Sequence, residues 1–488
     1  MSEIAKQPVR RRSVPWSASQ PREPIQSQFS VGVTLLLVVP LLALGLRLAS
    51  EQTANLSFYL LAGYALLGRA HAIRALALAW LITMINPGFA PEATLAPVGR
   101  YLVIFAAAAA VFARSEFLSR GRVRLIMALT FGLGAFFVLH SMIVSPMLDV
   151  SLLKTISWTV VVLALFGAWM GLAPAEREAL SKQLFVGLVL VALLSLPLVL
   201  FPEGYLRNGT GFQGALNHPQ AFGSAMALLG AWSVGRLLGE KRPSWFLLGV
   251  AALCLVLVVL SEARTGGLAL VFGVTVAALV VPFLAGKRVS SVLPGLKSRR
   301  FQVVAFVALA AAIVMGSFLV SVAEEFIAKS GRANVTGLME AYEVSRGGLM
   351  DTMTDNIRRD PWRGIGFGVA SDPYLMTITR DPVLGLPVGA AIEKGVMPLA
   401  VLEEGGILGF VLVAFWMWTV LRLSARGGIA PLAVVITILL VNMGEAVLFS
   451  PGGMGLLQLI LVGWAISTSF EKKGIHPSSG SSHTTTGN

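Results

Sequence analysis

The chain of 488 residues is 56% hydrophobic and 13% charged, and its apolar residues come in long blocks. This composition excludes an ordinary soluble domain and predicts an integral membrane protein. The formal net charge of +13 does not indicate nucleic-acid binding, because the Lys and Arg residues lie mostly in short loops between apolar runs. A single cysteine, Cys254, excludes a disulfide or a cysteine metal cluster within one chain.

The N-terminal residues 1–28 carry three consecutive arginines, with Pro and Ser but no apolar period and no evident signal peptide. They predict a disordered cytoplasmic segment. After them we expect a transmembrane helical bundle at 29–322, a large, partly helical periplasmic loop at 323–398, C-terminal transmembrane helices at 399–471 and a disordered cytoplasmic tail at 472–488.

The apolar runs lie near residues 30–49, 56–68, 73–85, 101–113, 123–144, 152–171, 184–201, 221–238, 245–261, 266–285, 303–322, 399–421, 429–448 and 454–470. Several are shorter than the roughly twenty residues that a span needs. The runs are compatible with about ten to fourteen helices, and about twelve to fourteen are expected.

Alternate loops between these runs are rich in Lys and Arg, as the positive-inside rule requires of real spans. The intervening loops carry few cations, chiefly Arg47, Arg100, Lys154 and Arg207. With the N-terminus inside, both termini are cytoplasmic and the loop at 323–398 is outside.

Four polar segments then reach the outer face, and the first is the glycine-rich stretch 204–220. It holds Arg207, Asn217 and His218, and its glycines allow the backbone to turn tightly beside a ligand. An ordinary external loop is the alternative interpretation.

The second segment, 261–265, places Glu262 and Arg264 between two apolar helices. Charges at that depth are costly unless they are paired or line a wet cavity. Arg264 either snorkels or pairs with Glu262 for folding alone, or its guanidinium makes a bidentate contact with a pyrophosphate.

The large loop contains a stretch, 351–359, that predicts a short helix, followed by a glycine-rich turn at 362–368. Backbone N–H groups of such a turn can approach an anion, but a plain structural turn fits the glycines as well. Arg363 in this turn is a candidate for substrate or lipid-headgroup contact, or else part of a solvated face.

Carboxylates mark the start of the run at 399–421 and the fourth segment, 442–453. Glu404 is too deep for a casual surface residue, and it either caps, pairs with an arginine or acts as a base. Lys394 precedes it in the sequence. Glu445, near the outer end of the run at 429–448, has the same possible roles. The five histidines are scattered without ligand spacing, so no metal site is expected.

Four motifs resemble the O-antigen ligase and O-antigen polymerase superfamily, and together they cover roughly residues 184–421. They are SEARTG at 261–266, Ser345-Arg346, DPWRGIGFG at 360–368 and LEEGGILG at 402–409. The resemblance implies an all-α, GT-C-like helical membrane fold in the bacterial inner membrane, with a large periplasmic loop between two late helices. It also implies a metal-independent glycosyltransferase without a cofactor.

Members of this family transfer a glycan from undecaprenyl diphosphate to an acceptor hydroxyl. The resemblance assigns the donor diphosphate to Arg264 and Arg346, and it makes candidate substrate contacts of the polar residues at the same face: Arg207, Asn217, Glu262, Arg363, Lys394 and Glu445. Expected partners are the lipid-linked donor, a glycan or lipid-linked acceptor, membrane lipids and other polysaccharide assembly proteins, but not nucleic acid.

The chain departs from the family at one position, because Lys394-Gly395-Val396 stands where a His-Asn pair is usual. This favours a polymerase, or a ligase-like enzyme with another acceptor, and leaves His218, Glu393 or Glu404 to supply any base. His218 is the first choice, since an imidazole accepts a proton near neutral pH, and a helix-start residue bonded to backbone is the alternative.

Two functions from other classes also fit many spans with interior charges. One is a transporter of a small solute or ion, although the sequence has no internal repeat and no paired broken helices. The other is a scaffold of a polysaccharide assembly complex without chemistry of its own.

Overall fold

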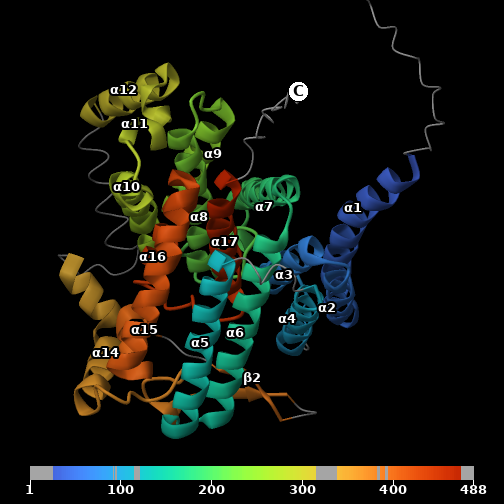
Figure 1. The fold of residues 1–488 in the computed structure, drawn as a ribbon, viewed down its shortest axis with the longest axis vertical. Coiled ribbons are helices and arrows are strands. Elements are labelled where there is room, and N and C mark those ends of the chain that lie inside the picture. The colour runs from blue at the N-terminus through green and yellow to red at the C-terminus, as the bar shows by residue number, and fades with distance from the viewer. Residues whose placement is uncertain are drawn as a thin grey trace, which may run out of the picture.

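The computed structural model describes residues 26–91, 93, 96–114, 121–314, 338–381, 385–390 and 394–473. The predicted N-terminal segment and the C-terminal tail lie almost entirely outside these residues. The described part is built from helices, with one antiparallel pair of short strands (Figure 1).

The first helices are α1 (Gln26–Ala49), α2 (Glu51–Leu66), α3 (Arg69–Met84), α4 (Ala96–Phe112), α5 (Gly121–Val144), α6 (Leu148–Gly171) and α7 (Pro174–Ser195). The turns η2 (Pro197–Leu200) and η3 (Pro202–Gly204) lead to α8 (Pro219–Gly239), α9 (Trp245–Leu260), α10 (Arg264–Ala285), α11 (Val289–Val292), η4 (Pro294–Lys297) and α12 (Arg299–Val314). The last elements are α14 (Leu338–Arg359), η5 (Pro373–Leu375), β1 (Ile378–Arg380), β2 (Pro387–Ala390), α15 (Met397–Gly427), α16 (Ile429–Val441), α17 (Gly453–Ser467) and η6 (Thr468–Lys473).

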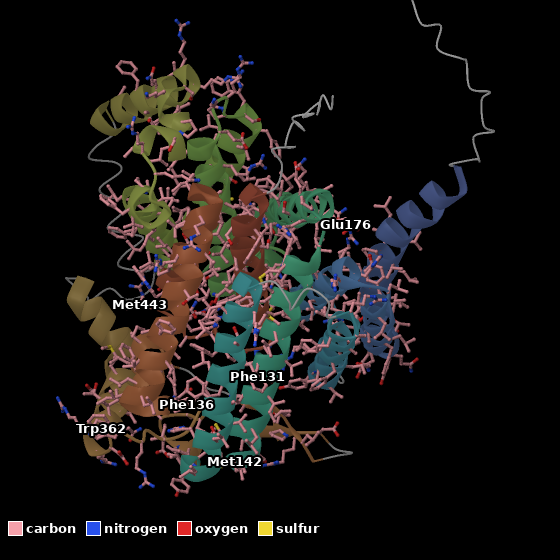
Figure 2. All side chains as sticks on the ribbon, in the orientation of Figure 1. Phe131, Phe136, Met142, Glu176, Trp362 and Met443 are labelled. Carbon is pink, nitrogen blue, oxygen red and sulfur yellow. The ribbon has the colours of Figure 1, made fainter. Side chains whose placement is uncertain are left out.

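This is an all-α, multi-pass membrane fold. Among the described residues, seven helices are long and apolar enough to cross a membrane, and four shorter helices are also apolar. The expected total of twelve to fourteen spans stays a prediction. Apolar side chains cover the outer faces, and in Figure 2 the exposed Phe131, the half-buried Phe136 and the exposed Met142 follow one another along α5.

Two helices, α8 and α17, form the centre of the bundle. Both are buried nearly all round, as expected for helices that are apolar on every face. Their indole rings meet at Trp232 and Trp464, with centroids 4.0 Å apart. Glycines such as Gly230 and Gly235 let neighbouring helices approach α8 closely.

Connections between helices gather in two groups. In the first group, Asn86 after α3 donates to the carbonyl of Gly214 after α7, and the Phe212 N–H donates to Leu260 at the end of α9. This group also holds Lys154 and Lys394, so we call it the lysine end. It consists of the segments that the charge pattern places outside, although the side of the membrane stays a prediction.

The second group holds the segments with most of the arginines, and we call it the arginine end. Arg69 at the start of α3 donates to the carbonyl of Gly171 at the end of α6. Arg177 at the start of α7 donates to the carbonyl of Ser467 at the end of α17. The two ends therefore differ in composition as the alternation of loops predicts.

Candidate functional site

The helix α15 is broken at its third turn, and the glycine-rich turn of the large loop fills the break. Gly406 has φ 62° and ψ −171°, a backbone conformation that only glycine adopts readily. The carbonyls of Glu403 and Glu404 lose their helical partners and accept instead from the Ile365 and Gly366 N–H groups, at 2.9 and 3.0 Å. On the far side of the break, the Ile407 N–H donates to the carbonyl of Pro361.

The N–H groups of this turn are occupied by acceptors of the protein itself. Gly364 N–H donates to the carbonyl of Asp360, and Arg363 N–H donates to its carboxylate. Gly368 N–H donates to Glu404 Oε2 at 2.8 Å. The anion held by the turn is thus a protein carboxylate, which favours the structural interpretation over a phosphate site. The Arg363 side chain is exposed, and the neighbouring Trp362 projects from the surface in Figure 2.

Next to the break lies a buried charge network, formed by Lys154, Asn356, Lys394, Glu403 and Glu404. The Lys394 ammonium lies 2.7 Å from Glu403 and 2.9 Å from Glu404, and its side chain is 2% exposed. Asn356 of α14 donates to the Glu403 carboxylate at 2.8 Å. Lys394 thus neutralises two carboxylates, and its predicted contact with substrate stays a prediction. Glu404 pairs with this lysine.

Two further cations are Lys154, within this charge network, and Arg100, near it. In the sequence they served only as evidence for the membrane topology. Lys154 Nζ donates to the carbonyl of Gly368 at 3.1 Å, and the charges of Glu404, Lys394 and Arg100 act on it. Arg100 lies directly against Gly452. Lys154 and Lys394 therefore lie near Glu404, and Arg100 is close enough for its charge to act on Lys154. Lone charges in otherwise cation-poor loops were the signal that could have identified them.

The turn that carries Arg264 packs against the segment that follows α16. Glu262 adopts φ 52°, and Arg264 begins α10 with its side chain half-buried. Thr265 packs so closely on Gly444 that no Cβ would fit there. The Glu445 backbone therefore lies beside the Arg264 turn.

The segment that follows α16, residues 442–448, also contacts Lys394. The Ala446 N–H donates to the Lys394 carbonyl at 3.0 Å, and the Met397 N–H donates to the Asn442 carbonyl at 3.0 Å. The buried Asn442 side chain fixes the turn, because its Oδ1 accepts from both Val447 and Leu448 N–H at 2.8 Å. The Arg264 turn and the charge network are thus connected through one hydrogen-bonded segment.

His218 occupies the position immediately before α8. Its Nδ1 accepts a hydrogen bond from the Gln220 N–H at 3.2 Å, so it is the N-cap of the helix, followed by Pro219 at the first helical position. The ring is exposed. This geometry favours the alternative interpretation, a helix-start residue, since the Nδ1 lone pair is already used.

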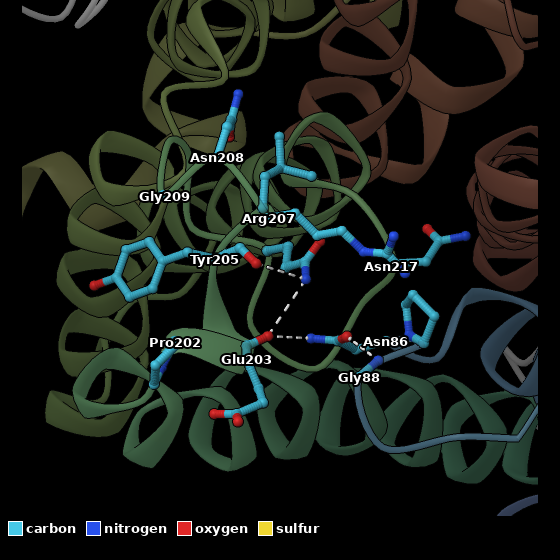
Figure 3. A pocket seen from close by; sticks show the side chains of 12 residues that line it. Asn86, Gly88, Pro202, Glu203, Tyr205, Arg207, Asn208, Gly209 and Asn217 are labelled. Carbon is cyan, nitrogen blue, oxygen red and sulfur yellow. Dashed lines mark hydrogen bonds between the residues drawn. The ribbon is translucent and has the colours of Figure 1, made fainter.

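Arg207 and Asn217 line a separate cavity of about 980 Å³ at the same end (Figure 3). The Arg207 side chain extends toward Asn217 across it. Asn86 fixes one wall, donating to the carbonyls of Glu203 and Gly214 at 2.7 and 2.8 Å. Arg207 and Asn217 thus line the same cavity, while their contact with a substrate stays a prediction.

Arg346 lies on α14, which also contains the predicted short helix at 351–359 and begins earlier, at Leu338. The Arg346 side chain and Glu393 are outside the described residues. Within the described ranges, no three His, Cys, Asp or Glu side chains are placed to hold a metal ion. No known protein family and no curated protein matches the chain.

Proposed function

We propose that the protein is a metal-independent glycosyltransferase that works at the lysine end. It transfers a glycan from undecaprenyl diphosphate to an acceptor hydroxyl, as a polymerase or ligase of the O-antigen type in the bacterial inner membrane. The lysine end faces the periplasm in this proposal, because the cation-rich arginine end belongs in the cytoplasm.

The observation that carries the proposal is the convergence of cations from distant parts of the chain. Lys154 of α6 and Lys394 before α15 lie near Glu404, Arg100 of α4 is close enough to act on Lys154, and the Arg264 turn connects to them through residues 442–446. Cations gathered at the end of an apolar bundle suit an anionic group that arrives with a lipid.

In the proposed reaction the hydroxyl oxygen attacks the anomeric carbon, and the bond from that carbon to the diphosphate oxygen breaks. The leaving diphosphate carries the developing negative charge, which preorganised cations stabilise. Arg264 and Arg346 hold the diphosphate in this proposal, and the bidentate geometry of a guanidinium suits it.

The candidate bases Glu404 and His218 already bond within the protein. Both oxygens of the Glu404 carboxylate have partners, Lys394 at Oε1 and Gly368 N–H at Oε2, and the His218 Nδ1 caps α8. We therefore propose that the arginines carry most of the catalysis. The hydroxyl proton then passes to water or to an oxygen of the leaving diphosphate.

One feature favours the alternative function, a transporter of a small solute or ion. Broken helices such as α15 supply unwound carbonyls that coordinate ions in many transporters. Here the freed carbonyls of Glu403 and Glu404 already accept hydrogen bonds from the Ile365 and Gly366 N–H groups. The transferase is for this reason the first proposal.

Deletion of the gene, followed by gel analysis of surface glycans, tests the function. Single-repeat products indicate a lost polymerase, and accumulated lipid-linked polymer indicates a lost ligase. Unchanged surface glycans would contradict both.

Cysteine labelling tests the proposed orientation with one exposed position at each end of the bundle. In a background without Cys254, we expect Asn208→Cys at the lysine end to react with an impermeant reagent in intact cells. Lys241→Cys, before α9, should react only after lysis. The reverse pattern would place the charge network on the cytoplasmic side.

A further inference from the structure

An apolar groove runs between α1, α3, α7 and α17, apart from every residue discussed for the transferase. It has a volume of about 410 Å³ and is lined by apolar side chains that include Leu37, Pro40, Trp80, Leu188 and Leu461. This volume is in the range of ligand pockets, about 300–1,000 Å³. Three of its walls, on α1, α7 and α17, belong to candidate membrane-spanning or shorter apolar helices, so lipid chains are its natural surroundings.

The floor of the groove on α7 is a glycine. Gly187 is exposed, and a Cβ added there would meet no atom within 4 Å. The helix therefore has open space over its backbone at this point, with Leu184, Leu188 and Val191 of the same helix also lining the groove. This open, apolar surface leaves room for a hydrocarbon chain.

The groove has one polar wall, where Arg74 donates through Nε to the Gln183 side chain at 2.9 Å. Arg74 belongs to the arginine end, and Lys182 lies beside Gln183 in the sequence. A guanidinium has five N–H donors and binds phosphate well. Lys182 is already paired with Glu178, so Arg74 is the cation of this wall that an anionic headgroup would contact.

We propose that this groove binds one acyl chain of an anionic phospholipid, whose phosphate lies on Arg74. A chain gains little hydrophobic free energy by leaving the bilayer for the groove, since both are apolar. Selection must therefore come from the shape at Gly187 and from the charge at Arg74. Basic pockets between helices on the cytoplasmic side are suited to anionic headgroups.

The test uses the purified full chain in a neutral detergent, with phosphatidylglycerol or phosphatidylcholine added, and native mass spectrometry as the readout. Gly187→Leu fills the groove, whereas Gly249→Leu on α9 adds the same side chain at another exposed helical glycine with open space around it. We expect wild type and Gly249→Leu to retain one phosphatidylglycerol per chain. Retention should fall about tenfold or more in Gly187→Leu.

The polar wall is tested separately, so that the proposal stays falsifiable if Gly187→Leu does not fold. Arg74→Gln should remove the preference for phosphatidylglycerol over phosphatidylcholine, and Arg124→Gln, an exposed arginine outside the groove, should keep it. Free glycerol phosphate should not displace the lipid, because the chain is needed.

Equal lipid retention in Gly187→Leu and Gly249→Leu would overturn the groove as the site. An unchanged headgroup preference in Arg74→Gln would overturn the role of the guanidinium. Stronger retention of undecaprenyl phosphate than of phosphatidylglycerol would assign the groove to a polyprenyl chain instead.

Discussion

Both ends of the bundle carry buried cations, and Arg177 at one end and Lys394 at the other satisfy their charges in different ways. At the arginine end, Arg177 donates to the carbonyls of Trp169, Leu172 and Ser467, at the ends of α6 and α17. Such contacts cap helix C-termini and complement their dipoles, so they need no other anion. At the lysine end, Lys394 is held by two carboxylates, while Lys154 donates to the carbonyl of Gly368.

This difference shows that the group that binds a buried cation says more about the role of that cation than its depth does. The number of cations at one end says less as well. Backbone carbonyls carry only partial charge and are fixed parts of the fold. Carboxylates bring full negative charge into a low-dielectric region. Their desolvation costs free energy unless the geometry of the ion pairs is excellent, so a buried network of this kind is a candidate functional site. The predictions below test whether the stability and activity of the protein depend on the charged side chains at the lysine end.

The largest effect is expected for Lys394→Met, which leaves Glu403 and Glu404 buried without their ammonium partner. Breaking a buried pair in this way costs about 3–5 kcal/mol. The unfolding midpoint of the purified protein in detergent should fall sharply. Lys182→Met is the matched control, because its ion pair with Glu178 is mostly exposed, and it should change the midpoint little. Similar midpoints for the two variants would show that the buried carboxylates do not depend on Lys394.

A smaller loss is expected for Gly406→Ala, at the break in α15. A Cβ there would meet the carbonyl oxygen of Trp362, and the backbone conformation itself disfavours alanine. Strain of this kind costs about 1–3 kcal/mol, which should lower the midpoint and loosen the turn at 361–368. Gly249→Ala, in a regular helix with open space, should be neutral or stabilising. An unaffected Gly406→Ala would mean that the break is not held by this turn.

The smallest effect is expected at His218. His218→Ala removes the cap of α8 and should cost about 1 kcal/mol of stability. His218→Asn keeps a capping acceptor without an imidazole, so both stability and glycan transfer should be retained. If transfer in a well-folded His218→Asn fell about a hundredfold, the histidine would be the base after all.

The sequence predicted the class of fold, because long apolar runs and alternating loop charges depend on local composition. It also predicted the turn at 362–368, and its glycines do adopt positive φ at Gly364, Gly366 and Gly368. The helix α14 was predicted too short, since Gly347 and Gly348 suggest a boundary, yet a glycine costs a helix only about 1 kcal/mol.

The charge network could not be predicted from the sequence. Lys154 and Gly368 are 214 residues apart, and nothing local in the sequence links them. Lys394 and Glu403 are closer in sequence, but whether they meet depends on how the chain enters α15. The role of His218 as a cap, in contrast, follows from a local signal, since proline at the next position often begins a helix.

The most direct test of the account is glycan transfer by the purified protein in lipid nanodiscs, with an undecaprenyl-diphosphate-linked glycan as donor. We compare wild type with Arg264→Ala, Arg264→Lys and Arg300→Ala, the last being an arginine that donates to the carbonyl of Pro243 at the arginine end. Wild type and Arg300→Ala should transfer at similar rates. Arg264→Ala should lose about a hundredfold or more, and Arg264→Lys should also be impaired. Equal transfer by all four proteins, or no release of undecaprenyl diphosphate by the folded wild type, would contradict the account.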